Sequence, residues 1–286
     1  MKIAVASGKG GTGKTFVSTN LANVASKAVR VALYDLDVDE PNCHLFFNRD
    51  HEAVETVKTM IPVVDGEKCL HCGTCSDVCE FHAIVSLPTD VLVFPELCHS
   101  CYGCLEMCPE EAITEGFKDI GTITVSEHRS MTLVTGKLRI GQPATTALVR
   151  ATKDEADTNV DVTFYDSPPG TSCPVIEVVK DVDYVILVGE PTRFGLHDLD
   201  LMVQTLKQLD RHFGVIINKA AEQNHLLEDY CREQEIDVIV RIPERSDIAV
   251  AYARGELVTE TMPELEELFG RTFKRLRQIT VGSAHE

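Results

Sequence analysis

Short runs of apolar residues alternate along the chain with stretches in which apolar positions recur at helical spacing. Continuous apolar strands separated by amphipathic helices are typical of a parallel sheet covered on both faces. The pattern therefore predicts a doubly wound α/β fold with a parallel sheet. The predicted strands cover 3–6, 29–34, 160–165, 184–188, 213–217 and 238–242, and the predicted helices cover 14–27, 196–209, 226–235, 247–253 and 263–277.

The alternation breaks between about residues 60 and 116, where the chain contains an internal repeat. Four cysteines of one half recur in the other half 29 positions later, and the same shift maps 83–84 onto 112–113, which are Ala-Ile in both places. A duplicated unit inside a βαβ chain indicates an inserted α+β module. We expect this module to cover 59–117 and to divide a larger domain made of 1–58 and 118–286.

Composition narrows the possible partners and the compartment. The 286 residues carry a formal net charge of −18, which disfavours nucleic acid or an anionic membrane as the main partner. The first strand follows Met1 directly without a secretory signal, and no apolar run reaches the length of a membrane span. We therefore expect a cytoplasmic protein, in which dense, closely spaced cysteines indicate metal ligands before disulfides.

A phosphate-binding loop is predicted between the first strand and the first helix, where the sequence fits G-x-x-x-x-G-K-[ST]. Backbone N–H groups of such a loop turn toward phosphate oxygens, and the helix N-terminus adds partial positive charge. Lys14 would contact the β- and γ-phosphates, and the Thr15 hydroxyl would bind Mg²⁺. A glycine-rich turn that binds nothing is the alternative. The predicted nucleotide-binding residues are Gly8, Gly10, Gly11, Thr12, Gly13, Lys14 and Thr15.

Lys9 makes the loop more specific, because the sequence from Lys9 to Thr15 reads K-G-G-T-G-K-T. This form resembles the deviant Walker A motif of the MinD/ParA/Mrp/nitrogenase-iron-protein class of P-loop ATPases. The resemblance implies that ATP is held between two protomers and that Lys9 contacts the phosphates bound by the partner. The second protomer would be another copy or a similar paralogue. Alternatively, Lys9 is a solvated loop residue.

Two further acidic segments resemble elements of the same family. Residues 35–42 follow the second strand and resemble switch I, which implies that Asp37 orients the attacking water and that Asp39 helps hold Mg²⁺. Residues 166–171 resemble Walker B with switch II, which implies that Asp166 contacts the Mg²⁺ site. A cluster of carboxylates at a strand end can instead be a solvated turn.

The adenine base is expected to lie near two later strand ends. Asn218 matches the family's adenine-contacting asparagine, and Pro243 stands where the family places a base-flanking loop. The resemblance covers about 1–50 and 130–260. It implies an ATPase, with hydrolysis slow and stimulated by a partner.

The cysteines of each repeat half follow C-x₂-C-x₂-C-x₃-C, the spacing of two-cluster bacterial ferredoxins, in which the fourth cysteine binds the other cluster. Zinc is the alternative, although zinc modules usually separate two C-x-x-C pairs by a longer gap. Cys108 precedes a proline, as in ferredoxins, whereas Cys79 precedes Glu80, so the two clusters should differ in potential. The predicted [4Fe–4S] ligands are Cys69, Cys72, Cys75 and Cys108 for cluster 1, and Cys98, Cys101, Cys104 and Cys79 for cluster 2.

Three cysteines and the C-terminal segment are left over. Cys173 is expected to be a small packed side chain, the alternative being a ligand of a third cluster between protomers. Cys231 lacks a C-x-x-C companion, which puts in doubt the chemistry of Mrp-type cluster carriers, and Cys43 has no assigned role. The basic, apolar helix 263–277 is expected to pack on the sheet rather than to bind a membrane.

Together these features predict an ATP-dependent iron–sulfur protein. Because the module leaves the chain just after switch I, the nucleotide state would gate electron transfer from the two clusters to an unidentified redox partner. A second hypothesis is a carrier that transfers clusters to an accepting protein. A third is a MinD-like positioning ATPase with a redox-sensing module.

Overall fold

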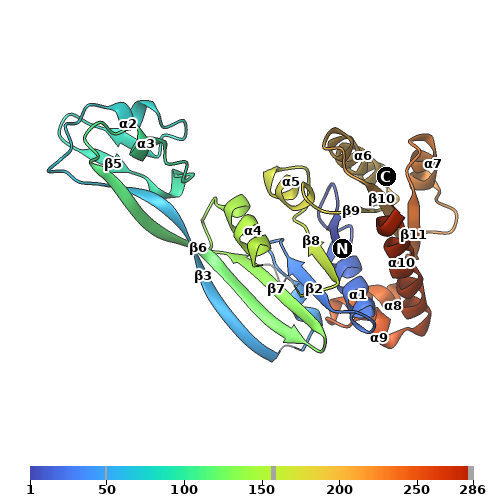
Figure 1. Ribbon diagram of the computed structural model, residues 1–286. Coiled ribbons are helices and arrows are strands. Elements are labelled where there is room, and N and C mark those ends of the chain that lie inside the picture. The colour runs from blue at the N-terminus through green and yellow to red at the C-terminus, as the bar shows by residue number, and fades with distance from the viewer. Residues whose placement is uncertain (49, 156–158, 283–286) are drawn as a thin grey trace. The chain divides into compact units, whose positions relative to one another are not determined.

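The computed structural model describes residues 1–48, 50–155 and 159–282, and the chain divides into two compact units (Figure 1). Unit 1 comprises Met1–Val54, Ile123–Lys137 and Val149–Glu286, and unit 2 comprises Glu55–Thr122 and Leu138–Leu148. The sequence places the module boundaries at 59 and 117 and assigns 138–148 to the larger domain. The boundaries differ because they fall inside two long strands, not in linkers, so no change of composition marks them.

The sheet has the strand order β11-β10-β9-β1-β8-β2-β7-β6-β3, with parallel pairing from β11 through β7. The expected parallel α/β sheet is therefore present. The strands are β1 (Lys2–Ala6), β2 (Val31–Asp35), β3 (Asp50–Val64), β6 (Ile113–His128), β7 (Met131–Leu138), β8 (Val162–Asp166), β9 (Tyr184–Gly189), β10 (Phe213–Ala220) and β11 (Val238–Pro243).

Helices cover the strands on both faces, as alternate side chains of β1 require. Ile3 and Val5 belong to a core shared with α1 (Lys14–Ser26) and α10 (Pro263–Gly282), which contact each other. The other helices are α4 (Thr145–Asp154), α5 (Cys173–Val179), α6 (Arg193–Gln208), α7 (Leu226–Glu233), α8 (Ser246–Ala253) and α9 (Val258–Thr261), with a 3₁₀ turn η1 at Cys43–Phe46. Predicted helix and strand ends agree within three residues, except that α10 continues to Gly282.

The terminal helix packs in the core, as expected. Leu265, Phe269, Phe273 and Leu276 of α10 are buried, and the Arg275 guanidinium donates to Asp237 Oδ1 at 2.6 Å. Within the described residues, no helix is both long enough and apolar enough to cross a membrane.

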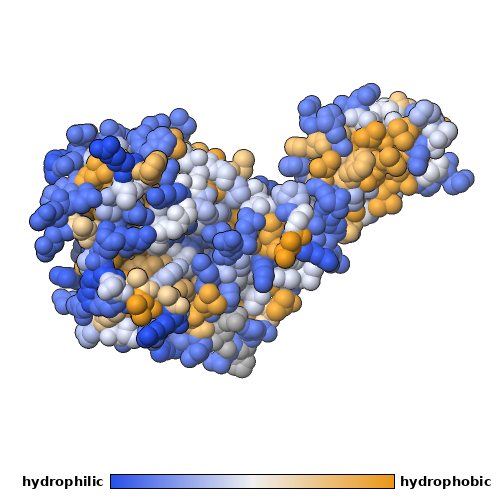
Figure 2. Space-filling view, turned by 180° about the vertical axis from the view of Figure 1, so that it is seen from behind, coloured by the Kyte–Doolittle hydropathy of each residue, from blue (hydrophilic) through white to orange (hydrophobic). Residues whose placement is uncertain are grey.

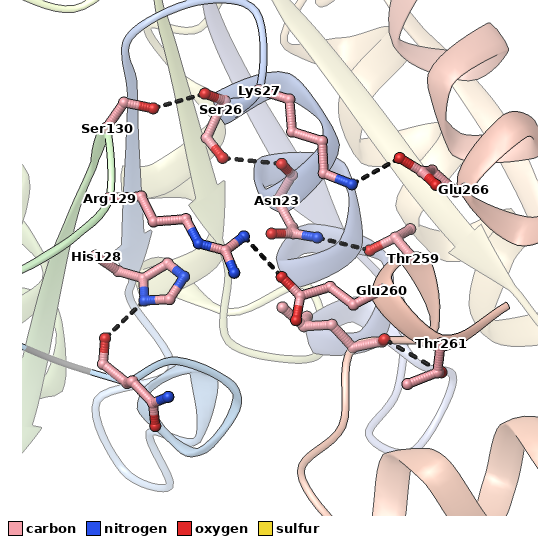
Figure 3. Close-up of polar contacts among 12 residues, drawn as sticks. Asn23, Ser26, Lys27, His128, Arg129, Ser130, Thr259, Glu260, Thr261 and Glu266 are labelled. Atoms are coloured by element: carbon pink, nitrogen blue, oxygen red, sulfur yellow. Dashed lines mark hydrogen bonds and ion pairs between the residues drawn. The ribbon is translucent and has the colours of Figure 1, made fainter. Parts of the chain in front are cut away.

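Polar contacts fasten the β6–β7 turn and the C-terminal helices to α1 (Figure 3). Arg129 donates to Glu260 Oε1 at 2.8 Å, and the Ser130 hydroxyl donates to the Ser26 carbonyl at 2.6 Å. The Asn23 amide donates to Thr259 Oγ1 at 2.9 Å in a buried position. The phosphate loop precedes α1, so the helix behind that loop is held at its far end by the β6–β7 turn.

Unit 2 preserves the sequence repeat in its backbone. It contains α2 (Thr74–Asp77), α3 (Gly103–Glu106), a 3₁₀ turn η2 (Pro95–Leu97) and an antiparallel hairpin of β4 (Ile84–Ser86) and β5 (Val91–Val93). The helices α2 and α3 begin 29 positions apart. Residues with positive φ recur at the same shift, as the pairs His71 and Ser100, Gly73 and Tyr102, and His82 and Glu111.

Candidate functional site

The phosphate loop connects β1 to α1 and depends on glycine at several positions. Gly11 and Gly13 have backbone φ values of 78° and 98°, which residues other than glycine rarely adopt. A Cβ atom at Gly8 would lie 1.9 Å from the Asp198 carbonyl oxygen, and one at Gly13 would lie 2.2 Å from Asn218 Nδ2. Gly10 faces open space. The loop is therefore built with its backbone close to neighbouring segments and one side free.

Thr15 and Asp166 lie together at the carboxyl ends of β1 and β8. The Thr15 hydroxyl donates to Asp166 Oδ2 at 2.7 Å, and the Ser18 hydroxyl donates to Oδ1 at 2.8 Å. Burial raises the pKa of the fully buried Asp166, an effect opposed by the Thr15 hydrogen bond and the Lys14 charge. A hydroxyl and a carboxylate in contact at the end of a phosphate loop fit a Mg²⁺ site.

Asp35 and Cys43, to which the sequence assigned no role, complete a buried cluster with Asp166. Asp35 Oδ2 accepts the backbone N–H groups of Asn42 and Cys43, each at 2.8 Å. The Cys43 thiol donates to Asp166 Oδ2 at 3.4 Å, and one ligand atom from each of the three residues lies within 4.8 Å of the others. Burial and the two carboxylates raise the pKa of Cys43 well above its usual value, which keeps the thiol protonated. Because this contact joins positions 43 and 166, which lie far apart in the sequence, no local sequence pattern predicts it.

Asp37 is partly buried after β2. Its pKa is raised to about 6, mainly by burial; the Asp166 and Asp39 carboxylates act in the same direction and the Lys14 ammonium acts against them. A carboxylate with a pKa near the working pH suits proton acceptance. Asp39 is exposed, and among the described residues it is not hydrogen-bonded to Thr15 or Asp166, which bond to each other.

Lys9 belongs to the phosphate loop, and two of the residues near the expected adenine site, Asn218 and Lys219, are hydrogen-bonded to that loop. The Lys9 carbonyl accepts from the Ser7 hydroxyl at 2.6 Å, while its ammonium has no partner among the described residues. The Asn218 amide donates to the Thr12 carbonyl at 2.8 Å. Lys219, which sequence reasoning gave no role, donates to the Gly11 carbonyl at 3.0 Å and pairs with Glu190. Pro243 is exposed at the end of β11.

The four thiols expected for cluster 1 line one pocket of unit 2. Cys69, Cys72 and Cys75 come from the first half of the repeat and Cys108 from the second. The pocket wall also includes apolar side chains such as Leu70. The crossover of the fourth cysteine is therefore present in the fold.

The second set of thiols is also grouped. Burial raises the pKa of Cys104 to about 11, and the neighbouring Cys98, Cys101 and Cys79 act in the same direction, Cys98 the most. Matched backbone donors serve the two crossover cysteines. The Ala83 N–H donates to Cys79 Sγ and the Ala112 N–H donates to Cys108 Sγ, both at 3.3 Å. Hydrogen bonds to sulfur favour the thiolate and tune a bound cluster.

The spacing of the eight thiols bears on zinc, the alternative to a cluster. Tetrahedral zinc with Zn–S bonds of 2.3 Å brings its sulfurs to about 3.8 Å from one another. Among the described residues, no three of these thiols lie within 4.8 Å of one another. In the structure these thiols are therefore not gathered at the distances of a tetrahedral zinc site.

The remaining cysteines differ from one another. The expectation that Cys173 is packed is wrong, because Cys173 is exposed at the first residue of α5, where the chain emerges from switch II. Cys231 is 1% exposed on α7, and burial raises its pKa to about 11. An inert, buried Cys231 agrees with a structural role.

Comparison with known proteins places these features in one family. The family described as the CobQ/CobB/MinD/ParA nucleotide binding domain matches residues 3–258. The uncharacterized protein MJ0578 of Methanocaldococcus jannaschii is 30% identical over 281 residues, covering 98% of this chain and 97% of its own. The uncharacterized ATP-binding protein MJ0823 of the same organism is 25% identical, covering 96% and 98%. The septum site-determining protein MinD complexed with Mg-ADP, from Pyrococcus horikoshii OT3, has a similar fold, with a TM-score of 0.61 at 18% identity and coverage of 97% and 96%.

Proposed function

The chain belongs to the CobQ/CobB/MinD/ParA nucleotide-binding family and is an ATPase, and from this premise we propose that its nucleotide state gates electron transfer through unit 2. Unit 2 would hold two [4Fe–4S] clusters that pass electrons to a protein partner. The observation that carries the proposal is strand β3, which starts shortly after switch I and ends at Val64, shortly before Cys69, the first of the eight cysteines.

The nucleotide half of the proposal rests on the groups around the phosphate loop. Lys14 would neutralise the phosphates, and Thr15 and Asp166, which are hydrogen-bonded to each other, would hold Mg²⁺. Asp37 orients the attacking water and accepts its proton. Lys9, whose ammonium has no partner among the described residues, reaches the nucleotide of a second protomer, either another copy or a similar paralogue.

The redox half rests on the two thiol sets. Cys69, Cys72, Cys75 and Cys108 would hold one cluster, and Cys98, Cys101, Cys104 and Cys79 the other. The bound clusters would supply one-electron transfer. The chain's own contribution would be to gather Cys69, Cys72, Cys75 and Cys108 around one pocket and to donate backbone N–H groups to Cys79 and Cys108.

A chain of contacts supports coupling between the halves. Asp35 holds the backbone of switch I at Asn42 and Cys43, and η1 then leads into β3. Within unit 2, the Ser100 hydroxyl donates to the Met60 carbonyl of β3 at 2.7 Å and lies 2.6 Å from the Thr59 hydroxyl. Ser100 stands between Cys98 and Cys101, so a movement of β3 would reach the loop that carries two cluster-2 thiols.

The test is an anaerobic redox titration of the reconstituted protein without nucleotide, with ADP and with a non-hydrolysable ATP analogue. We expect the potential of cluster 2 to differ among the three states. Ser100→Ala should keep the iron content but lose this nucleotide dependence. Thr89→Ala, which removes an exposed hydroxyl in the hairpin turn of the same unit, should keep both. Equal potentials in all three states of the unmodified protein would refute the coupling.

The structure also bears on the two alternative functions, a cluster carrier and a positioning ATPase. A cluster carrier would transfer clusters to an apo-acceptor, but the buried Cys231 without a companion does not support carrier chemistry of the C-x-x-C kind. A positioning ATPase that binds membrane through its C-terminal helix would need the apolar face of α10 free. In the structure that face is buried against α1.

A further inference from the structure

The β4–β5 hairpin of unit 2 has two apolar faces. In its antiparallel register, Ile84 lies opposite Val93, Val85 opposite Leu92, and Ser86 opposite Val91. Because side chains alternate along a strand, Ile84, Val91 and Val93 share one face. Val85 and Leu92 share the other, and the alternation continues to Leu87 and Phe94 beyond the two strands.

The face that carries Ile84, Val91 and Val93, which we call the inner face, packs inside unit 2. Ile84 is buried, and Val91 and Val93 pack in the same cluster as the cysteines Cys75, Cys79, Cys104 and Cys108. The inner face thus forms part of the apolar wall around both thiol sets.

The outer face, which we define as Val85, Leu87, Leu92 and Phe94, has no such cover. Leu87 is 41% exposed, and Leu92 and Phe94 are each 42% exposed. An antiparallel hairpin with one buried face normally carries polar residues on the other. Apolar side chains are exposed elsewhere on unit 2 as well, among them Leu70 and Met107, and Figure 2 shows apolar side chains gathered in one patch on the smaller body, at the upper right. Grouped exposed apolar side chains of this kind mark interaction sites.

The charge around the outer face specifies the occupant. Asp90 directly precedes β5 and Glu96 lies in η2, which follows β5, and both side chains are exposed. Unit 2 as a whole carries twelve Asp and Glu residues against four Lys and Arg residues. A second copy would bring the same excess of negative charge, whereas a surface rich in Lys and Arg would be attracted.

We propose that the outer face docks a protein whose contact surface is apolar at its centre and ringed by Lys and Arg. This inference rests on the proposed function, because the occupant is then the redox partner. One strand layer would separate the partner from the thiols. Layers of a folded protein pack about 10 Å apart, so the electron path from either thiol set would be short.

The test measures binding directly, with cytochrome c as the probe because it is a small basic haem protein. The oxidised, cluster-loaded chain is titrated with oxidised cytochrome c in a calorimeter at low salt, so that no electron transfer is involved. Leu92→Gln and Phe94→Gln remove apolar surface without changing the charge, and each should raise the Kd by about tenfold. Phe117→Gln, at a 61% exposed position on β6 of the same unit, is the matched control and should leave the Kd unchanged.

A second pair of variants tests whether the carboxylates beside the outer face contribute more to binding than other carboxylates of unit 2 do. Asp90→Asn and Glu96→Gln should each weaken binding by a few fold and reduce its salt dependence. Glu115→Gln removes one exposed carboxylate from β6 and should have a smaller effect. Iron and sulfide content is measured for every variant. If Leu92→Gln loses its clusters, the comparison with Phe117→Gln is made with Phe94→Gln alone.

Two results would overturn the docking proposal. One is an equal Kd for the outer-face variants and Phe117→Gln. The other is self-association of the unmodified chain that Leu92→Gln abolishes, because the occupant would then be a second copy. Failure of the proposed function looks different, because the dithionite-reduced chain would then pass no electrons to a small dye. If the dye is reduced normally while the outer-face variants bind cytochrome c as tightly as Phe117→Gln does, the docking proposal alone has failed.

Discussion

The pH dependence of ATP hydrolysis should report the raised pKa of Asp37. Asp37 is proposed to act in its ionised form, and burial raises its pKa to about 6 from 3.8. With the raised value, about nine tenths of the molecules are ionised at pH 7 and about one tenth at pH 5. With the ordinary value, ionisation would still be nearly complete at pH 5. The rate should therefore fall by roughly tenfold as the pH falls from 7 to 5.

The assay is the pH profile of kcat/KM at saturating Mg²⁺, since this parameter reports the free enzyme, the state to which the structure corresponds. Asp37→Asn is the control, because any acidic limb that survives in its residual activity belongs to the substrate or to another group. An acidic limb centred near pH 4, or the same limb in Asp37→Asn, would refute the reasoning.

Three further predictions follow from the site and the core. Lys9→Ala should retain ATP binding but lose ATP-dependent dimerisation in analytical ultracentrifugation, whereas Lys14→Ala should lose nucleotide binding itself; dimerisation of Lys9→Ala would contradict the trans role. Cys108→Ser should disturb the cluster held by the first half of the repeat, and Cys79→Ser the other cluster, so electron paramagnetic resonance of the two reduced variants should lose different signals. Phe269→Ala, at a side chain 1% exposed between α10 and α1, should lower the free energy of unfolding by about 3–5 kcal/mol in urea titration, and a loss below 1 kcal/mol would contradict the packed helix.

The sequence predicts well those features that depend on residues close together in the chain. The apolar strands of unit 1 are continuous because both faces of the sheet are covered, so their positions are visible in the chain. The phosphate loop must follow a strand and precede a helix, and its glycines are fixed by backbone geometry at Gly11 and Gly13. The spacing of the cysteine repeat likewise places Cys108 with Cys69, Cys72 and Cys75, and these four residues line one pocket in the structure.

The long ribbon of β3 and β6 could not be predicted in this way. Most side chains from 52 to 59 are exposed, so the strand carries no apolar pattern and reads as ambiguous. Its hydrogen-bonding partner lies far along the chain: the Asp65 N–H donates to the Ala112 carbonyl at 2.7 Å. The helix α4 within 138–155 was missed for a related reason, since it follows the ribbon and not an apolar strand. The exposure of Cys173 depends on the path of switch II, which no spacing rule reveals.

The buried cluster of Asp35, Cys43 and Asp166 gives the proposed coupling a physical starting point. Asp166 Oδ2 accepts hydrogen bonds from both Thr15 and Cys43, so a Mg²⁺ ion that draws this carboxylate toward Thr15 competes with the thiol. Cys43 is the first residue of η1, and β3 begins at Asp50. A change at the proposed Mg²⁺ site therefore has only a short segment to cross before it acts on β3, which ends at Val64, shortly before Cys69. The backbone that leaves unit 1 through β3 is the backbone that enters unit 2, so the proposed coupling can act along the chain itself.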